Sequence, residues 1–149
     1  MKYEIGKVTD EELTEIFSNA GKNFTEATGF NVSGKQEKAL SFYKQSMYQG
    51  GYFLVARSHN KLLGWILLDR SYDYFINKEV GWINDIYVKK EYRKNGIAKR
   101  LIFEGIKEFR KKGFLEVSLN VYSTNKHAIS LYKSLGFQEA SKLMTKTIE

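Results

Sequence analysis

Apolar and polar residues alternate along the chain with two different periods, which mark helices and strands. Residues 97–110 carry an apolar residue every three or four positions, and this spacing makes one apolar stripe along a helix. Residues 114–121 carry apolar residues at every second position instead, which predicts a strand with one buried face. Two apolar runs at 52–57 and 62–68 are separated by a short polar stretch and predict a β-hairpin.

The remaining elements are assigned from shorter patterns and from capping residues. The N-terminal part begins with a strand at 3–8, followed by a helix that has Asp10 as its N-cap and carries Leu13, Ile16, Phe17 and Ala20 on one face. A loop or broken helix at 21–35 comes next, and then a helix at 36–47 that ends at Gly50-Gly51. The later elements are a polar connection at 69–78, a strand at 82–88, a short helix that is capped by Thr124 or Asn125 and ends at Gly136, and a final strand or hairpin at 137–148. The strand–helix–strand unit that ends at residue 121 predicts a parallel strand pair with a right-handed crossover. Together with the hairpins it predicts an α/β chain with a mixed sheet covered by helices.

Composition limits the class of protein and the kinds of site it can hold. A chain of 149 residues without a linker predicts one domain over 1–149. The absence of cysteine excludes disulfides, thiolate metal sites and cysteine nucleophiles, and it fits a cytoplasmic protein. No metal site is predicted. No apolar run approaches the length of about 18 residues that spans a membrane, so neither a signal peptide nor a membrane span is expected.

The net charge of +7 is compatible with phosphate ligands, with nucleic acid or with simple solubility. A nucleic-acid-binding domain gathers Lys and Arg with exposed aromatic residues on one face, whereas the basic residues here are spread along the chain. The densest basic run, at 107–112, falls at the C-terminal end of a predicted helix, where cations suit the helix dipole. A nucleic-acid partner is therefore not expected.

The segment at 93–98 links the strand at 82–88 to the helix at 97–110. Free backbone N–H groups at a helix N-terminus, together with the helix dipole, bind phosphate. Gly96 stands where the helix begins, and it lacks the Cβ atom that blocks close approach of a ligand to the backbone. The segment also lacks the Gly-Lys-Ser/Thr ending of a P-loop. We therefore expect a phosphate-bearing cofactor that is not held by a P-loop.

The same residues carry a resemblance to a known family. Residues 93–98 (Arg-x-x-Gly-x-Ala) resemble the signature of the GNAT superfamily of acetyl-CoA-dependent N-acetyltransferases, and 86–88 (Ile-Tyr-Val) precede it at the spacing of that family. Residues 125–137, which begin with Asn-x-x-Ala and end in Leu-Gly-Phe, resemble the family's C-terminal motif. The predicted element order also matches over nearly the whole chain. The resemblance implies a GNAT-like fold: a mixed, mostly antiparallel sheet flanked by about four helices, in which a parallel strand pair splays apart around the cofactor.

The resemblance also implies roles for individual residues. The backbone N–H groups of 93–99 are implied to hold the pyrophosphate of acetyl-CoA, and the main chain of 86–88 to pair with pantetheine and polarise the thioester carbonyl. Tyr132 is implied to be the general acid for the departing CoA thiolate. Asn125 is implied to hydrogen-bond the cofactor arm, and it shares a helix face with Tyr132 because the two lie two turns apart. The residues expected to contact the cofactor are Ile86, Tyr87, Val88, Arg93, Lys94, Asn95, Gly96, Ile97, Ala98, Lys99, Asn125 and Ala128.

The reaction needs a neutral amine, whereas an ordinary amine with a pKa of about 10 is protonated at neutral pH. Asp85, within the strand that carries the thioester site, is the first candidate for the base, and Glu79 is a second. Asn84 occupies the position where polyamine-acetylating relatives carry a glutamate base, which argues against a polyamine-type mechanism. Period-two alternation predicts that Asp85 and Asn84 point to opposite faces of the sheet. His127 and His59 are weaker candidates, in a first helical turn and a hairpin turn.

The acceptor is a small-molecule or peptide amine, and the sequence leaves its identity open among a metabolite amine, an amino acid, a protein N-terminus or lysine, and an aminoglycoside. In this family the first two helices and the last hairpin are implied to set specificity. Aromatic residues that suit an apolar or cationic acceptor are Phe24, Phe30, Tyr43, Tyr72, Tyr74 and Phe75. A non-catalytic module that senses acetyl-CoA is the alternative, against which Tyr132 argues. A homodimer through a strand near 142–148 is expected only by analogy with relatives.

Overall fold

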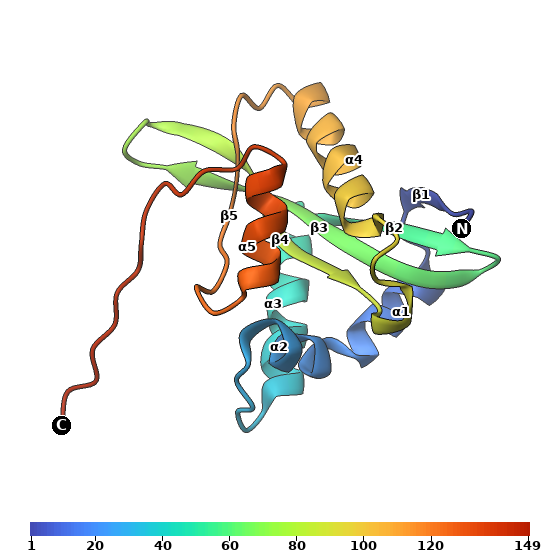
Figure 1. The fold of residues 1–149 in the computed structure, drawn as a ribbon, viewed down its shortest axis with the longest axis horizontal. Helices are drawn as coiled ribbons and strands as arrows, with labels where there is room; N and C mark the ends of the chain where they lie inside the picture. The colour runs from blue at the N-terminus through green and yellow to red at the C-terminus, as the bar shows by residue number, and fades with distance from the viewer.

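The five strands of the sheet lie side by side in the order in which they occur in the sequence (Figure 1). The computed structural model describes residues 1–149. The strands are β1 (Glu4–Lys7), β2 (Tyr52–Ser58), β3 (Lys61–Asp73), β4 (Lys78–Val88) and β5 (Val117–Leu119). The first three neighbouring pairs are antiparallel, and β4 and β5 are parallel. The mixed, mostly antiparallel sheet with one parallel pair is therefore confirmed.

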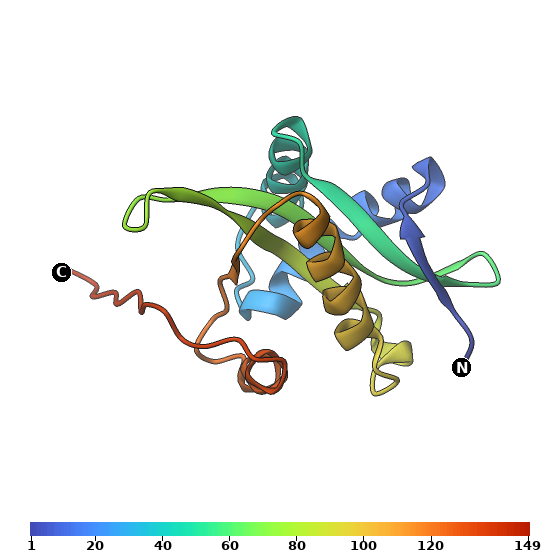
Figure 2. The same cartoon turned by 90° about the horizontal axis from the view of Figure 1, so that it is seen from above.

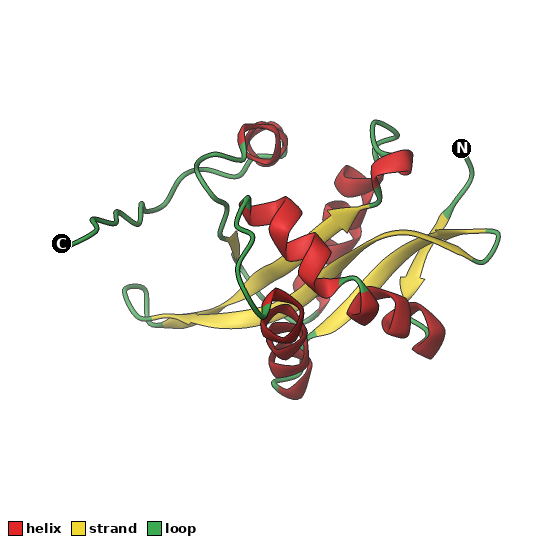
Figure 3. Ribbon diagram, turned by 90° about the horizontal axis from the view of Figure 1, so that it is seen from below, coloured by secondary structure: helices red, strands yellow, loops and turns green.

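Helices cover both faces of this sheet (Figures 2 and 3). The helices are α1 (Asp10–Ser18), α2 (Ala20–Thr28), α3 (Lys35–Tyr48), α4 (Ile97–Lys111) and α5 (Lys126–Ser134), with a short 3-10 helix, η1, at Lys90–Tyr92. α1, α2 and α3 pack around Trp65 and Leu67 of β3, whereas α4 and α5 pack on the other face around Ile66 and Leu68. Because side chains alternate along a strand, β3 supplies both cores. No helix is long and apolar enough to cross a membrane.

The structure corrects one N-terminal prediction and makes another more specific. Thr9, not Asp10, caps α1: its hydroxyl accepts from the Glu12 N–H at 3.2 Å, and the Glu12 carboxylate accepts from the Thr9 N–H at 2.9 Å. This pair is a capping box, which the Thr-x-x-Glu spacing encodes. Within the loop or broken helix predicted at 21–35, residues 20–28 form the helix α2, which ends at Gly29 in the left-handed conformation, and residues 29–34 are not helical. The polar composition of α2 conceals it, since only a few of its residues face the core.

The segment at 69–78 is not a connection but the outer part of a long β-hairpin. β3 and β4 remain paired out to Asp73 and Lys78. Backbone pairing continues here although the tip is largely exposed, with Tyr74 and Phe75 at 84% and 102% exposure. Exposed side chains on the tip leave no apolar alternation in the sequence, so the strand ends could not be recognised.

The final strand or hairpin predicted at 137–148 does not form. Residues 138–149 run as an extended segment away from α5 (Figure 1), and Leu143, Met144 and Ile148 are each about nine-tenths exposed. A strand needs a neighbouring edge to satisfy its backbone groups, and the segment lies against none within the chain. The predicted strand at 114–121 is likewise shortened to β5.

Candidate active site

The parallel pair β4–β5 opens into a gap after only a short ladder. Pairing covers Gly81–Ile83 against Val117–Leu119, and β4 then continues to Val88 paired with β3 alone. The Lys89 N–H donates to the Leu63 oxygen at 2.9 Å. Because alternate residues of an antiparallel strand bond the same neighbour, the main-chain groups of Ile86 and Val88 point to the open edge. An extended ligand with amide groups can pair with this edge.

A β-bulge lies where the two strands begin to diverge. Leu67 pairs with Asp85 and Leu68 with Ile83, so Asn84 is the extra residue. Its amide donates to the Asp69 carboxylate at 3.1 Å and to the Ser46 hydroxyl at 3.2 Å, and Ser46 donates to Asp69 at 2.6 Å. These bonds fix the bulge against α3.

The prediction that Asn84 and Asp85 point to opposite faces is wrong. Asn84 contacts Ser46 and Asp85 contacts Tyr43, and both partners belong to α3. The inserted residue of the bulge breaks the period-two alternation of the strand. Two consecutive polar side chains are therefore delivered to the same side of β4.

Replacing Asn84 with aspartate is expected to destabilise the protein by about 1–3 kcal/mol, because the two N–H donors are lost and a second carboxylate is placed against Asp69. Urea unfolding measures this change. Asn31→Asp is the matched control, since Asn31 is exposed and bonds only Lys35; its effect should stay within about 0.5 kcal/mol. Equal small losses in both variants would show that the Asn84 bonds do not hold the bulge.

Asp85 is a buried carboxylate held by two donors. It accepts hydrogen bonds from the Tyr43 hydroxyl at 2.6 Å and from the Trp65 indole N–H at 2.9 Å. Burial raises the pKa of Asp85 above its usual range, and the two hydrogen bonds offset this only in part. Burial, and then the Asp85 charge, also raises the pKa of Tyr43. Asp85 is therefore a better proton acceptor than an ordinary aspartate.

Tyr132 on α5 is a half-buried tyrosine whose hydroxyl has no hydrogen-bond partner within the protein. Its ring packs edge-to-face on Phe137, with ring centres 5.9 Å apart. Burial and the neighbouring negative charge of Asp85 raise the pKa of Tyr132 to about 12. The structure thus brings together the two residues predicted to be catalytic, and it leaves the Tyr132 proton available to a ligand.

The loop between η1 and α4 presents six consecutive free backbone amides. None of the N–H groups of residues 94–99 donates a hydrogen bond within the protein, and the first that does is Arg100, to the Gly96 oxygen at 3.1 Å. Gly96 has φ +74°, and a Cβ built on it would meet nothing within 4 Å. Asn95 holds the loop by donating to the Tyr92 oxygen at 3.0 Å. Such a row of amides at a helix N-terminus fits a phosphate or pyrophosphate group.

Arg93 lies beside this row but is directed away from it. Its own N–H donates to the Lys90 oxygen at 3.4 Å, and its Nε donates to the Val88 oxygen at 2.8 Å. The guanidinium forms an ion pair with Glu26 and lies 5.4 Å from the centre of the Tyr87 ring. Glu26 belongs to α2, and sequence reasoning missed it because this segment was interpreted only as a loop or a broken helix.

The second motif that was predicted to contact the cofactor begins at the N-cap of α5. The Asn125 carbonyl oxygen accepts from the Ala128 N–H at 3.2 Å and so caps the helix, which leaves the Asn125 amide group without a partner. Across the gap, Phe30 and Tyr122 meet edge-to-face with ring centres 5.7 Å apart. This contact joins the end of α2 to the segment between β5 and α5, and it forms an aromatic wall beside the gap.

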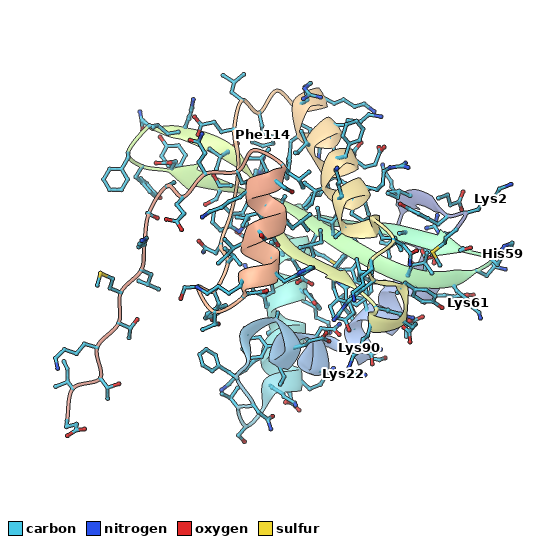
Figure 4. All side chains as sticks on the ribbon, in the orientation of Figure 1. Lys2, Lys22, His59, Lys61, Lys90 and Phe114 are labelled. Atoms are coloured by element: carbon cyan, nitrogen blue, oxygen red, sulfur yellow. The ribbon has the colours of Figure 1, made fainter.

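Other candidates from the sequence lie elsewhere. Glu79 pairs with Tyr72 near the exposed tip of the β3–β4 hairpin, which also carries Tyr74 and Phe75. His59 occupies the β2–β3 turn at the far end of the sheet from α5 (Figure 4). His127 is exposed in the first turn of α5. The remaining aromatic candidates, Phe24 and Tyr43, pack in the core between the sheet and α1–α3.

Comparisons with known proteins agree with this geometry. The model of the acetyltransferase (GNAT) family matches residues 13–137. "Uncharacterized N-acetyltransferase MJ1207" of Methanocaldococcus jannaschii is 32% identical over 143 residues, which cover 92% of this chain but 61% of that protein. The structure "Putative acetyl transferase from Pyrococcus furiosus" is 24% identical with a TM-score of 0.87, covering 99% of this chain and 100% of that chain. The structure of a "predicted acetyltransferase with acetyl-CoA" from Clostridium acetobutylicum is 14% identical with a TM-score of 0.78, covering 98% of this chain and 96% of that chain. The chain therefore belongs to the acetyltransferase (GNAT) family.

Proposed function

We propose that the protein transfers the acetyl group of acetyl-CoA directly to a primary amine while both substrates are bound. The observation that carries this proposal is the row of six free amides at 94–99, placed directly after the open edge of β4. The amides are suited to the pyrophosphate, and the main-chain groups of Ile86 and the N–H of Val88, which have no partner within the protein, are suited to the amides of pantetheine. The acetyl-CoA in the similar Clostridium acetobutylicum structure supports the choice of ligand.

In the proposed reaction, the amine nitrogen attacks the thioester carbonyl, a C–N bond forms and the C–S bond breaks. The Tyr132 hydroxyl donates to the departing thiolate. With a pKa of about 12, Tyr132 keeps its proton more firmly than an ordinary thiol, whose pKa is about 8.5. We therefore expect it first to stabilise the thiolate as a hydrogen-bond donor. Tyr132 then transfers its proton to the thiolate, because burial raises the pKa of the thiol and makes the thiolate more basic.

The protonated amine must lose two protons to become an amide. Asp85 is the proposed acceptor of the first, whose loss frees the nitrogen lone pair for attack, and the second leaves the nitrogen once the C–N bond has formed. The raised pKa of Asp85 suits a general base, and it lies close enough to Tyr132 for its charge to raise the pKa of that residue. Glu79 is too far along the hairpin to take this role. One amine proton ends on Asp85, Tyr132 gives its own proton to the thiolate, and the second amine proton restores the Tyr132 hydroxyl, so the reaction balances.

Asp85→Asn is expected to lower the acetylation rate most at neutral pH, where the amine is protonated. At a pH near the amine pKa of about 10, the rate of the variant should fall less far below the wild-type rate. Rates measured from pH 6 to 10 test this. A loss of equal size at every pH would mean that Asp85 only supports the structure.

Measurements of unfolding stability on the same variant test whether the pKa of the Asp85 carboxyl is raised in the folded protein. A raised pKa means that folded Asp85 binds its proton more tightly than unfolded Asp85 does. The free energy of unfolding of the wild type therefore contains a term that decreases as the pH rises from about 4 towards the raised pKa. This term should be missing in Asp85→Asn.

A non-catalytic acetyl-CoA sensor of the same fold is the second candidate. The unpartnered hydroxyl of Tyr132 beside Asp85 favours the enzyme, because a sensor needs neither group. Steady-state release of CoA with a panel of amines separates the two, and a thiol reagent can follow it without background because the chain has no cysteine. Binding of acetyl-CoA without turnover on any amine would favour the sensor.

A further inference from the structure

Glu26 is a charged residue that the proposed chemistry does not use, and it joins three elements of the site. It lies on α2, its carboxylate forms an ion pair with Arg93 of the cofactor loop, and it accepts a hydrogen bond from the Tyr87 hydroxyl of β4 at 2.9 Å. Burial acts to raise the pKa of Glu26, but the hydrogen bonds from Arg93 and Tyr87 outweigh it and lower the pKa. Glu26 is therefore an ionised carboxylate that is held by Arg93 and Tyr87.

The Arg93 side chain is held by its contacts with Glu26, Tyr87 and the β4 backbone. Its Nε bonds the Val88 oxygen at 2.8 Å, its guanidinium lies over the Tyr87 ring, and its terminal nitrogen bonds Glu26. The free amides begin only at the next residue, Lys94. The side chain of Arg93 is thus oriented towards α2, while the backbone that follows it is oriented for phosphate.

The two ends of α2 are held differently. At its N-terminal end, Gln36 of α3 accepts from the Gly21 N–H at 2.7 Å and donates to the Phe17 oxygen at 2.8 Å. The C-terminal end stops at Gly29, and the contacts described for it beyond α3 are Glu26 with the loop and Phe30 with Tyr122. Phe30 follows Gly29 directly, so the contact of Glu26 with the loop and the contact of Phe30 with Tyr122 lie at the same end of α2.

We propose that Glu26 is a positioning residue. Through Arg93 and Tyr87, it couples the loop at 94–99 to α2 and to the aromatic wall formed by Phe30 and Tyr122. The inference rests on the proposed function, in which phosphate binds at 94–99, and it adds that the amine approaches past the ring contact of Phe30 with Tyr122. Ligand at the amides orders the loop, the ordered loop fixes Arg93, and Arg93 holds Glu26. By linkage, the ordering of α2 and the binding of cofactor then favour each other.

Lys90 of η1 lies close enough to Glu26 for its charge to lower the pKa of Glu26 further. A free cation is therefore available near the phosphate loop while Arg93 stays paired. This arrangement lets the loop bind an anion without breaking the contact between Arg93 and Glu26.

Hydrogen exchange with acetyl-CoA as the probe tests the coupling without a known acceptor. In the wild type, acetyl-CoA should slow exchange both in the loop at 89–99 and at residues 24–28 of α2, the latter about tenfold, as expected for a coupling energy of this kind. In Glu26→Gln, the loop should still be protected, and protection of 24–28 should fall below about twofold. Arg93→Gln should behave in the same way.

Glu15→Gln is the matched control. Glu15 of α1 forms an ion pair with Lys89, directly after β4, and its side chain is 41% exposed compared with 36% for Glu26. This variant loses an equivalent ion pair to the same loop but should keep the protection of 24–28. Unchanged protection of 24–28 in Glu26→Gln, with the loop protected, would overturn the coupling alone. A wild-type loop that acetyl-CoA does not protect would instead overturn the proposed function.

Discussion

Replacing Gly96 with glutamate is expected to weaken acetyl-CoA binding at least about a hundredfold, close to abolishing it, while the protein stays folded. The side chain meets no neighbour in the free protein, so the expected effect comes from the site itself. A carboxylate at the first turn of α4 occupies the position at which six free amides point and repels the pyrophosphate. A loss of this size corresponds to about 2.7 kcal/mol of binding free energy. Calorimetric titration with acetyl-CoA measures it.

Gly113→Glu is the control for backbone strain. Gly113 lies just beyond the other end of α4, has φ +87°, and like Gly96 has nothing within 4 Å of a Cβ. Both variants force a non-glycine residue into the left-handed region and should each lose about 1 kcal/mol of stability. Only Gly96→Glu should lose the ligand. Full affinity for acetyl-CoA in Gly96→Glu would remove the loop at 94–99 from the site.

The second large effect is expected from Tyr132→Phe, which should lower kcat about a hundredfold or more and leave acetyl-CoA affinity within about twofold. The hydroxyl acts on the thiolate that appears only during the reaction, so ground-state binding does not depend on it. Because the hydroxyl has no partner within the protein, its removal should change the free energy of unfolding by less than about 0.5 kcal/mol. Steady-state CoA release and urea unfolding give the two quantities.

The pH dependence adds a further check on Tyr132. With a pKa of about 12 it stays protonated from pH 6 to 10, so the wild type should show no loss of rate from its ionisation in that range. Tyr122→Phe, at the aromatic wall, is the matched control and should keep kcat, since its ring contact with Phe30 remains. Wild-type turnover in Tyr132→Phe would contradict its role with the thiolate.

Those parts of the fold that follow from local periodicity could be predicted from the sequence. The apolar stripe at 97–110 became α4, with Ile97, Leu101, Ile102 and Phe109 buried on the sheet. The hairpin of β2 and β3 and the parallel pair of β4 and β5 also follow from the pattern and from the right-handed crossover. The loop for which anion binding is proposed could be recognised because a glycine coincides with the start of a helix.

Features that depend on tertiary contacts could not be read in the same way. The bulge at Asn84 exists because Asp69 and Ser46 bind its amide, and neither partner is near it in the sequence. α2 is stabilised by packing on α3 rather than by its own pattern, so Glu26 stayed hidden. The sequence predicted a final strand or hairpin at 137–148, but strand formation needs a neighbouring edge that the pattern cannot supply.

Thermal unfolding of the wild type in the presence of acetyl-CoA, ATP or NAD tests the central claim most directly. A ligand that binds only the folded state raises the free energy of unfolding by RT ln(1 + [L]/Kd), about 2.7 kcal/mol at a hundredfold excess over Kd. If the amides at 94–99 and the open edge of β4 together form an acetyl-CoA site, acetyl-CoA alone should give a saturable rise in Tm. An equal rise with ATP, or none with acetyl-CoA, would mean that the loop is a general anion site and would contradict the assignment.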